Sequence, residues 1–217
     1  MNILITGTTS GLGEALANVF RNAGHDVYAL NRDQCVLSKL ECIESALGSV
    51  LSGVERLDYV FLNAGILGRL TPTDELTLDE FNEAFNINVF SNKVILDWLL
   101  KNCKVKNVIG ISSGAALKSY FGWSLYCCSK AAFKQLLATY AEEVKETHFL
   151  SLAPGIIKTK MQDYIYSLDE KDLPSIVKFK KMYNDMDSPD VVANRIFNNL
   201  DLLKSKPSGS YFDMRDI

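Results

Sequence analysis

Short apolar runs alternate with segments of helical periodicity along nearly the whole chain. Runs with the length of buried strands are residues 2–6, 26–30, 57–62, 105–111 and 149–153, with a last strand at 209–213. Segments with the apolar spacing or length of helices are 14–23, 40–51, 79–103 and 122–146. Strands that alternate with helices are typical of an α/β fold. The pattern therefore predicts a doubly wound parallel sheet with helices on both faces.

Length and composition fit one globular domain. A chain of 217 residues can bury a single continuous core, so residues 1–217 are expected to form one unit. Hydrophobic residues make up 47% and charged residues 23%, and the net charge is −3. This charge leaves no basic stripe for phosphates, which argues against a nucleic-acid partner. The apolar run at 2–6 is too short for a signal peptide or a membrane span, so no membrane partner is expected.

The five cysteines are Cys35, Cys42, Cys103, Cys127 and Cys128. They form no CxxC pair and show no metal-ligand spacing, so no metal site is predicted. An odd number of cysteines without such a pattern favours free thiols in a reducing compartment. We therefore expect a cytoplasmic protein.

A glycine-rich turn follows the first strand and precedes the first helix. It contains Gly7, Gly11 and Gly13. Gly7 permits a tight turn, Gly11 lets the backbone approach a ligand, and Gly13 allows the helix to pack closely. Amides at such a helix start bind phosphate oxygens. The strand, turn and helix together predict a dinucleotide site, with a purely structural turn as the alternative.

The residues after the second strand bear on the choice of dinucleotide. An acidic residue at this place would hydrogen-bond the adenosine ribose and favour NAD, whereas an arginine can pair with a 2′-phosphate. The chain has Asn31 and Arg32 here. NADP(H) is therefore predicted over NAD(H), with the hydroxyls of Thr9 and Ser10 as possible further contacts. A solvated surface arginine is the alternative.

Tyr126 and Lys130 are four residues apart in a segment with helical character, so their side chains share one face. A phenol with a pKa near 10 is a poor acid at neutral pH, but an adjacent cation can lower that pKa by ~1–3 units. Tyr126 is accordingly a candidate general acid. Tyrosine and lysine also occur at this spacing by chance, so the pair needs support from the rest of the chain.

Small and polar residues follow three other predicted strands. They are Asn63-Ala64-Gly65, Ser112-Ser113-Gly114 and Pro154-Gly155. Open α/β sheets bind ligands at the carboxyl ends of their strands, so these residues are expected to line a site. Asn88, a poor helix former within the helix at 79–103, is a further candidate because its amide can be functional.

Six motifs occur in an order and spacing that resemble the short-chain dehydrogenase/reductase family. They are Thr6-Gly7-x-x-x-Gly11-x-Gly13, Asn63-Ala64-Gly65, Asn88, Ser113, Tyr126-x-x-x-Lys130 and Pro154-Gly155-x-x-x-Thr159. The resemblance covers nearly the whole chain, which is most similar to the small bacterial members called C-factor-like. It implies a single-domain Rossmann-type fold.

The resemblance also implies a catalytic tetrad of Asn88, Ser113, Tyr126 and Lys130. Tyr126 would protonate a carbonyl oxygen that Ser113 holds, while the nicotinamide delivers hydride to the carbon. Lys130 would bind the nicotinamide ribose and lower the Tyr126 pKa, and Asn88 would position a water. The alternatives are a turn role for Ser113 and a satisfied helix amide for Asn88. Thr159 could instead form a capping box with Gln162.

The implied cofactor site is larger than the glycine turn and includes two of the catalytic residues. Its members are Gly7, Thr9, Ser10, Gly11, Leu12, Gly13, Asn31, Arg32, Asn63, Ala64, Gly65, Tyr126, Lys130, Pro154, Gly155, Ile157 and Thr159. The implied partner is a small carbonyl or alcohol substrate. The helices at 79–103 and 122–146 could pair with those of another subunit in a homodimer or homotetramer.

The chain departs from the family between residues 32 and 57. Most members have a helix and then a strand here, the strand ending in an aspartate that approaches the adenine. Val36 stands at the aspartate position, and only a few residues join it to the second strand. Because a parallel crossover needs about a dozen residues, we expect the third strand and the helix before it to be missing. Val36 cannot accept a hydrogen bond, so adenine recognition would rest on backbone and apolar contacts.

Residues 160–187 are predicted to form a substrate lid, as the same region does in the family. Several apolar side chains occur in or beside this segment: Met161, Tyr164, Tyr166, Phe179, Met182, Tyr183 and Met186. Together with Phe121 and Trp123 they suggest a pocket for an apolar or aromatic carbonyl. Ordinary helix packing is the alternative.

Two classes of function are compatible with the sequence. The first is an NADP(H)-dependent oxidoreductase that transfers hydride between nicotinamide and a carbonyl/alcohol pair, reducing an apolar or aromatic ketone or aldehyde. The second is a cofactor-binding regulatory or signalling protein with little turnover, because fold alone does not decide activity. The complete set of Ser113, Tyr126 and Lys130 favours the enzyme. A dehydratase or epimerase built on the same site stays open.

Overall fold

A six-stranded, fully parallel sheet forms the centre of the protein. The computed structural model describes all 217 residues. The strands are β1 (Asn2–Thr6), β2 (Asp26–Leu30), β3 (Arg56–Leu62), β4 (Lys104–Ile111), β5 (His148–Ala153) and β6 (Tyr211–Asp213). Their order across the sheet is β2-β1-β3-β4-β5-β6, and every neighbouring pair is parallel. The order reverses beside β1, as in a Rossmann-type doubly wound fold, so the predicted fold class is confirmed.

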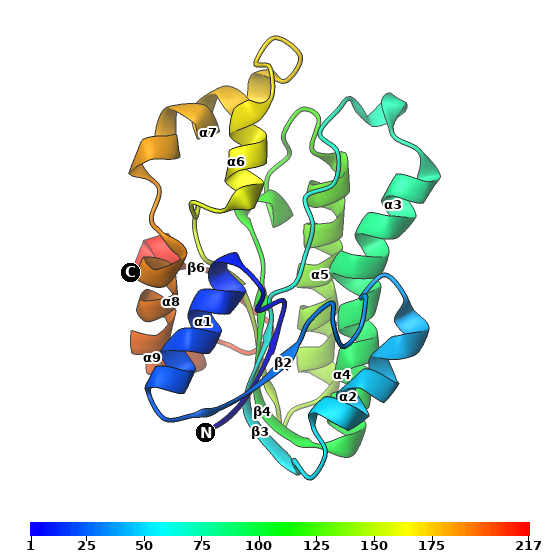
Figure 1. Ribbon diagram of the computed structural model, residues 1–217, viewed down its shortest axis with the longest axis vertical. Helices are drawn as coiled ribbons and strands as arrows, with labels where there is room; N and C mark the ends of the chain where they lie inside the picture. The colour runs from blue at the N-terminus through cyan, green and yellow to red at the C-terminus, as the bar shows by residue number, and fades with distance from the viewer.

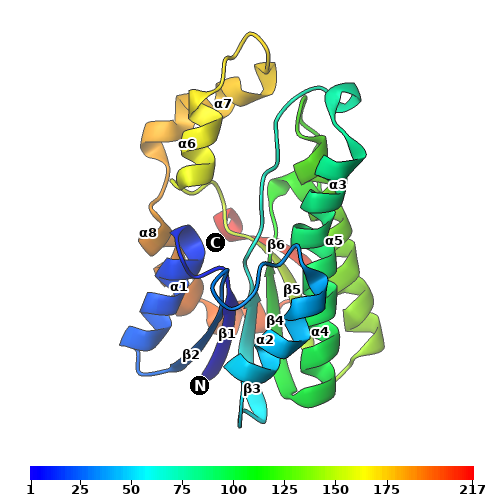
Figure 2. The same ribbon diagram turned by 45° about the vertical axis from the view of Figure 1, so that its right-hand side comes forward.

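Nine α-helices accompany the sheet. They are α1 (Gly11–Asn22), α2 (Ile43–Val50), α3 (Leu78–Phe85), α4 (Ser91–Asn102), α5 (Ser124–Glu143), α6 (Lys160–Ser167), α7 (Val177–Met182), α8 (Pro189–Asn198) and α9 (Leu200–Ser205). Helices α1, α8 and α9 lie on one face of the sheet, and α2, α4 and α5 lie on the other (Figure 1). Helices α6 and α7 stand beyond the carboxyl ends of the strands (Figure 2).

Alternation along the strands divides the core into two layers. Ile3 and Ile5 of β1 belong to the cluster under α1 and α8, whereas Leu4 belongs to the cluster under α4 and α5. All three side chains are fully buried. A strand covered by helices on both faces is apolar at every position. This is why the apolar runs in the sequence are continuous.

The sheet ends at β2, with no strand beyond it. Residues 31–39 form turns rather than a helix and a strand, and α2 follows after a short 3-10 turn at Leu40–Cys42. The expected loss of the third strand and its preceding helix is therefore confirmed. Val36 lies in this loop with 43% of its surface exposed.

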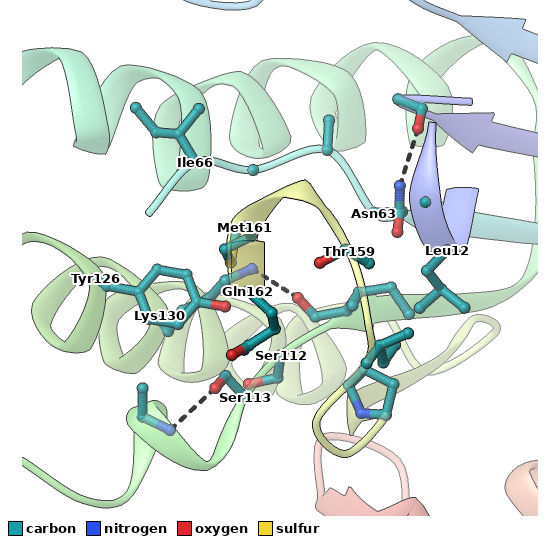
Figure 3. A pocket seen from close by; sticks show the side chains of 18 of the residues that line it. Leu12, Asn63, Ile66, Ser112, Ser113, Tyr126, Lys130, Thr159, Met161 and Gln162 are labelled. Atoms are coloured by element: carbon teal, nitrogen blue, oxygen red, sulfur yellow. Dashed lines mark hydrogen bonds between the residues drawn. The ribbon is translucent and has the colours of Figure 1, made fainter. Parts of the chain in front are cut away.

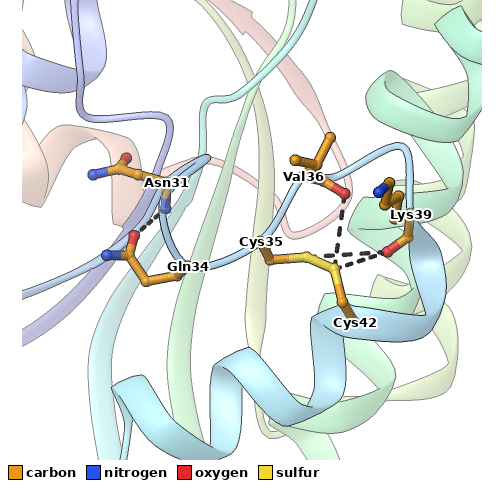
Figure 4. The surroundings of a disulfide bond; sticks show 6 residues. All are labelled: Asn31, Gln34, Cys35, Val36, Lys39 and Cys42. Atoms are coloured by element: carbon orange, nitrogen blue, oxygen red, sulfur yellow. Dashed lines mark hydrogen bonds between the residues drawn. A yellow bond between two sulfur atoms is a disulfide. The ribbon is translucent and has the colours of Figure 1, made fainter.

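A disulfide joins Cys35 to Cys42 across the shortened loop, with 6.1 Å between the two Cα atoms (Figure 4). The prediction that all five cysteines are free thiols is wrong for this pair. Only Cys103, Cys127 and Cys128 are free. An odd cysteine count cannot exclude one local pair, because a loop can bring two thiols together without a recognisable sequence spacing.

The helix predicted over residues 79–103 is interrupted. Helix α3 ends at Phe85, a π-helical turn spans Asn86–Phe90, and α4 starts at Ser91. A π turn inserts one extra residue into a helical path and is frequent at functional sites. Here it carries Asn88 on a buried face.

Helices α6 and α7 pack in a third apolar cluster, separate from the two layers around the sheet. It contains Trp123 at the start of α5, together with Ile165 and Phe179 from α6 and α7. This cluster holds residues 160–187 over the edge of the sheet, where lids occur in α/β enzymes. None of the helices is long and apolar enough to cross a bilayer.

Candidate active site

One large cleft of about 1810 Å³ runs along the carboxyl ends of the strands. Of the residues predicted to form the site, those that line it are Gly7, Thr9, Ser10, Gly11, Leu12, Asn31, Arg32, Asn63, Ala64, Gly65, Ser113, Tyr126, Lys130, Pro154, Gly155, Ile157 and Thr159. Gly13 and Asn88 lie behind the lining. The fold thus gathers residues that are up to 152 positions apart in the sequence, from Gly7 to Thr159, into one space.

The glycine turn depends on the absence of side chains at three positions. Gly7 and Gly11 have φ angles of +73° and +62°, in the left-handed region that side chains disfavour. A Cβ at Gly13 would lie 2.2 Å from the carbonyl oxygen of Gly7. The close approach at Gly13 is therefore to the turn itself, not only to the strand under the helix.

Two asparagines hold this turn in place. Asn63 donates through Nδ2 to the carbonyl oxygens of Thr6 and Gly7, at 2.9 and 3.2 Å. Asn31 accepts at Oδ1 from the backbone amide of Thr8, at 2.7 Å. Both side chains are engaged by the protein. Their contribution to a cofactor site is to fix the turn that would receive the phosphates.

The cleft fits a nicotinamide dinucleotide. Helix α1 begins at Gly11, directly at the lining, and the first amides of a helix have no intrahelical partner. Two polar atoms on the lining, Ser112 Oγ and Gln162 Oε1, are buried without a hydrogen-bond partner. Buried polar groups are normally paired, so this part of the cleft is built for a polar occupant. Arg32 and the disulfide loop border its far end.

Tyr126, Lys130 and Ser113 lie around the same part of the cleft (Figure 3). Lys130 Nζ is 5.7 Å from the centre of the Tyr126 ring and donates to the carbonyl oxygen of Ile111 at 2.8 Å. Ser113 Oγ accepts from the amide of Ala115 at 3.1 Å, so its hydroxyl hydrogen is free to point into the cleft. Ser113 can therefore stabilise its turn and donate a hydrogen bond in the cleft at the same time.

Burial dominates the acid–base properties of this pair. Burial raises the pKa of Tyr126 to about 12, against a lowering by the Ser113 hydroxyl. Burial also lowers the pKa of Lys130 to about 8. Desolvation of the phenol sets the direction in the protein alone, and Lys130 is not among the causes of the shift, so the lowering of the Tyr126 pKa by Lys130 stays a prediction. Tyr126 is a neutral phenol at pH 7, which is the form that donates a proton.

Asn88 is fully engaged within the protein. Its Nδ2 donates to the carbonyl oxygen of Ile66 and to Ser129 Oγ, each at 2.9 Å, and its Oδ1 accepts from the amide of Ile66 at 2.8 Å. No donor of this side chain is left for the expected water. Ser129, fully buried, in turn donates to the carbonyl oxygen of Tyr126 at 3.2 Å. Asn88 therefore connects the Ile66 loop to the first turn of α5.

Aromatic side chains form the wall next to Tyr126. The rings of Trp123 and Phe179 stack with 4.9 Å between centroids, and Tyr120 meets Phe179 edge-on at 5.8 Å. Phe121, which the sequence suggested for this wall, is 55% exposed and lies outside the cleft, and Tyr120 takes its place. From the apolar set predicted for the lid, only Met161 and Phe179 line the cleft.

Thr159 does not form a capping box with Gln162. It occupies the N-cap position of α6 but its side chain makes no cap hydrogen bond, and Gln162 Oε1 is unpaired. Both side chains line the cleft instead.

The carboxyl-terminal segment is the part of the lining that sequence reasoning missed. Tyr211, Asp213, Arg215 and Asp216 border the cleft on the side of Ser113. The signal was available, since the last strand was predicted at 209–213 and ligands bind at the carboxyl ends of parallel strands. Residues directly after that strand were therefore candidates.

This chain is similar in sequence to known proteins. Residues 34–169 match the family model described as short chain dehydrogenase. The chain belongs to the short-chain dehydrogenase family. The benzil reductase ((S)-benzoin forming) of Bacillus subtilis (strain 168) is 29% identical over 99% of this chain and 98% of its own.

Solved structures of short-chain dehydrogenases show the same fold. A putative family member from Shigella flexneri, complexed with NADP, has a TM-score of 0.78 at 20% identity over 99% of this chain and 96% of its own. A 3-ketoacyl-(acyl-carrier-protein) reductase from Brucella melitensis, complexed with NADH, has a TM-score of 0.79 at 19% identity over 98% and 95%. The family model and the benzil reductase relative make the protein an oxidoreductase of the short-chain dehydrogenase family, some members of which are complexed with nicotinamide cofactors.

Proposed function

We propose that the protein is an NADPH-dependent reductase of aromatic ketones or aldehydes, with Tyr126 as its general acid. The observation that carries this proposal is the placement of a neutral phenol, a hydroxyl donor and a buried lysine around one part of the cleft. The glycine turn opens into the same cleft. A regulatory protein without turnover would need the turn and the lysine but not the phenol and the serine.

When bound, NADPH supplies the hydride for the carbonyl carbon. Tyr126 donates a proton to the oxygen as negative charge develops there, and Ser113 holds that oxygen by a hydrogen bond. Lys130 provides a positive charge beside the phenol, which stabilises the tyrosinate left after proton transfer. Asn88, through Ile66 and Ser129, keeps the two sides of the site in register.

The aromatic wall supports the substrate class. Tyr120 lines the cleft beside Trp123 and Phe179, which stack on each other and keep only 4% and 7% of their surface exposed, so a substrate ring would reach them on movement of residues 160–187. Residues 160–187 carry Phe179 and Met161, so movement of this segment would open and close the wall as a lid. The relative named benzil reductase acts, by its name, on an aromatic ketone, which agrees with this wall.

NADPH oxidation tests the proposal directly. Purified protein is expected to oxidise NADPH with benzil, acetophenone and benzaldehyde at higher kcat/KM than with acetone or acetaldehyde. The physical reason is burial of the phenyl ring against the aromatic wall, at about 25 cal/mol per Å² of apolar surface. Faster turnover of the small aliphatic carbonyls would contradict the substrate class. Tight NADPH binding without turnover of any carbonyl would favour the regulatory alternative.

Arg32 is expected to select the cofactor. It lines the cleft next to the disulfide loop and has no ion-pair partner in the protein. Arg32→Ala should raise KM for NADPH roughly 10- to 100-fold, the value of one charge-assisted hydrogen bond or two, and leave KM for NADH within about twofold.

The matched control for Arg32 is Arg21→Ala, because Arg21 is exposed in the last turn of α1 and lies outside the cleft. An unchanged ratio of the two KM values in Arg32→Ala would remove the assignment of NADPH.

A further inference from the structure

An arginine at the end of the chain lies against the part of the cleft where the reacting oxygen is held. Arg215 follows β6 in a single 3-10 turn, Met214–Asp216, which is anchored by the buried side chain of Met214. The strand itself pairs with β5, with Asp213 opposite Ala153. The turn is therefore positioned by the sheet.

Arg215 lies next to two glycines of the lining, at ordinary van der Waals distances. A Cβ at Gly155 would be 3.6 Å from Arg215 Cγ, and one at Gly114 would be 4.0 Å from Arg215 Nη2. Gly114 directly follows Ser113, and Gly155 directly follows Pro154. The guanidinium therefore lies beside the loop that carries Ser113.

Asp213 fixes the direction of the guanidinium. Arg215 donates through Nε to Asp213 Oδ1 at 2.9 Å and through Nη2 to Oδ2 at 2.6 Å. Asp213 keeps only 13% of its side chain exposed, whereas Arg215 keeps 56%. The forked pair uses two of the five guanidinium N–H groups, so the remaining donors are available to a ligand in the cleft.

The net charge of the Arg215–Asp213 pair limits which ligand groups it can bind. Because Asp213 neutralises Arg215, the pair offers hydrogen-bond donors without a net positive charge. A carboxylate entering the cleft would also meet the Asp213 carboxylate. An uncharged oxygen acceptor suits this arrangement better than an anion.

We propose that Arg215, oriented by Asp213, binds the second carbonyl oxygen of a 1,2-dicarbonyl substrate whose first carbonyl oxygen is held by Ser113 and Tyr126. This inference rests on the proposed function and deepens it, by naming the group next to the reacting carbonyl that the site recognises. Arg215 is thereby a specificity-determining residue. The aromatic wall binds the ring, and the arginine distinguishes a diketone from a monoketone of the same shape.

Benzil and deoxybenzoin form the matched substrate pair for the test, since deoxybenzoin has a methylene where benzil has its second carbonyl. The variant Arg215→Met removes the donors and retains an unbranched chain against Gly155. It is expected to lower kcat/KM for benzil roughly 10- to 100-fold more than kcat/KM for deoxybenzoin. Lys160→Met is the control, because it removes a positive charge from the same cleft, does not act on Asp213 or Arg215, and should keep the wild-type ratio.

Equal losses on both substrates in Arg215→Met, or an equal change of the ratio in Lys160→Met, would overturn the inference. A wild-type protein that reduces neither compound would instead refute the proposed function. In that event, quenching of tryptophan fluorescence in the NADP⁺ complex still decides the role of Arg215. A benzil Kd that rises selectively in Arg215→Met supports it, and a Kd that does not change, or no benzil binding by the wild type, overturns it.

Discussion

Replacing Tyr126 with phenylalanine is expected to lower kcat for carbonyl reduction about 10²- to 10⁴-fold, the usual contribution of a positioned general acid. The hydroxyl is the group that donates the proton, and its pKa, raised to about 12 by burial, keeps it protonated across the working range. Phenylalanine fills the same volume, so the aromatic wall and the fold should persist. Single-turnover kinetics at saturating NADPH measures the loss.

Binding of NADPH is the companion measurement for Tyr126→Phe. The dissociation constant should change by less than about fivefold, since the loss of one hydrogen bond in a large interface is worth ~1 kcal/mol or less. Tyr164→Phe serves as the control, because Tyr164 is 40% exposed on α6 and lies outside the cleft. Retention of more than a tenth of the wild-type kcat in Tyr126→Phe would mean that another group supplies the proton.

Lys130→Met is expected to abolish most of the activity and to stabilise the fold. Lys130 is 4% exposed and its only hydrogen bond is to the carbonyl oxygen of Ile111. A pKa lowered from 10.5 to about 8 costs roughly 3 kcal/mol of folding free energy at pH 7. The substitution also leaves the Ile111 carbonyl without a hydrogen bond, which destabilises the fold. The net increase in the free energy of unfolding should therefore be roughly 1–2 kcal/mol. Urea unfolding at pH 7 measures it.

The pH dependence of stability separates this cause from better packing. Between pH 8 and 10.5 the folded protein has lost the Lys130 proton while the unfolded chain still binds it. The unfolded state then binds more protons, so the wild type gains stability as pH rises through this window. Lys130→Met should lack that gain. Lys134→Met, one turn further along α5, is the control and should keep the wild-type slope; a slope that persists in Lys130→Met would contradict the assigned cause.

Local sequence patterns predicted the sheet, the glycine turn and the shared helix face of Tyr126 and Lys130, through strand length, the backbone freedom of glycine and helical spacing. The convergence of Ser113 with this pair was predicted from the resemblance to the family. Only a few strand orders are then compatible with the chain, because the connections between parallel strands are right-handed and short. This is why separate motifs could be expected in one cleft before any contact was known.

Properties that depend on the surroundings of a side chain were not predictable in the same way. The spacing of Tyr126 and Lys130 implied a cation that lowers a phenol pKa, but burial of both groups reverses the direction. The role of Asn88 depends on Ile66 and Ser129, which are 22 and 41 positions away. The Arg215 side chain reaches the site only through the pairing of β5 with β6. The pKa shifts and the partners of these side chains can be known only once the tertiary contacts are known.

The disulfide between Cys35 and Cys42 changes how one end of the cleft is held. In a sheet with another strand outside β2, backbone hydrogen bonds between the two strands would support this end of the cleft. Here a covalent ring of eight residues, with Cys35 buried in the core, takes over this support. Closing so small a ring removes chain entropy worth about 2.5 kcal/mol. The support of this end of the cleft is therefore a property of the loop itself, separable from the stability of the sheet.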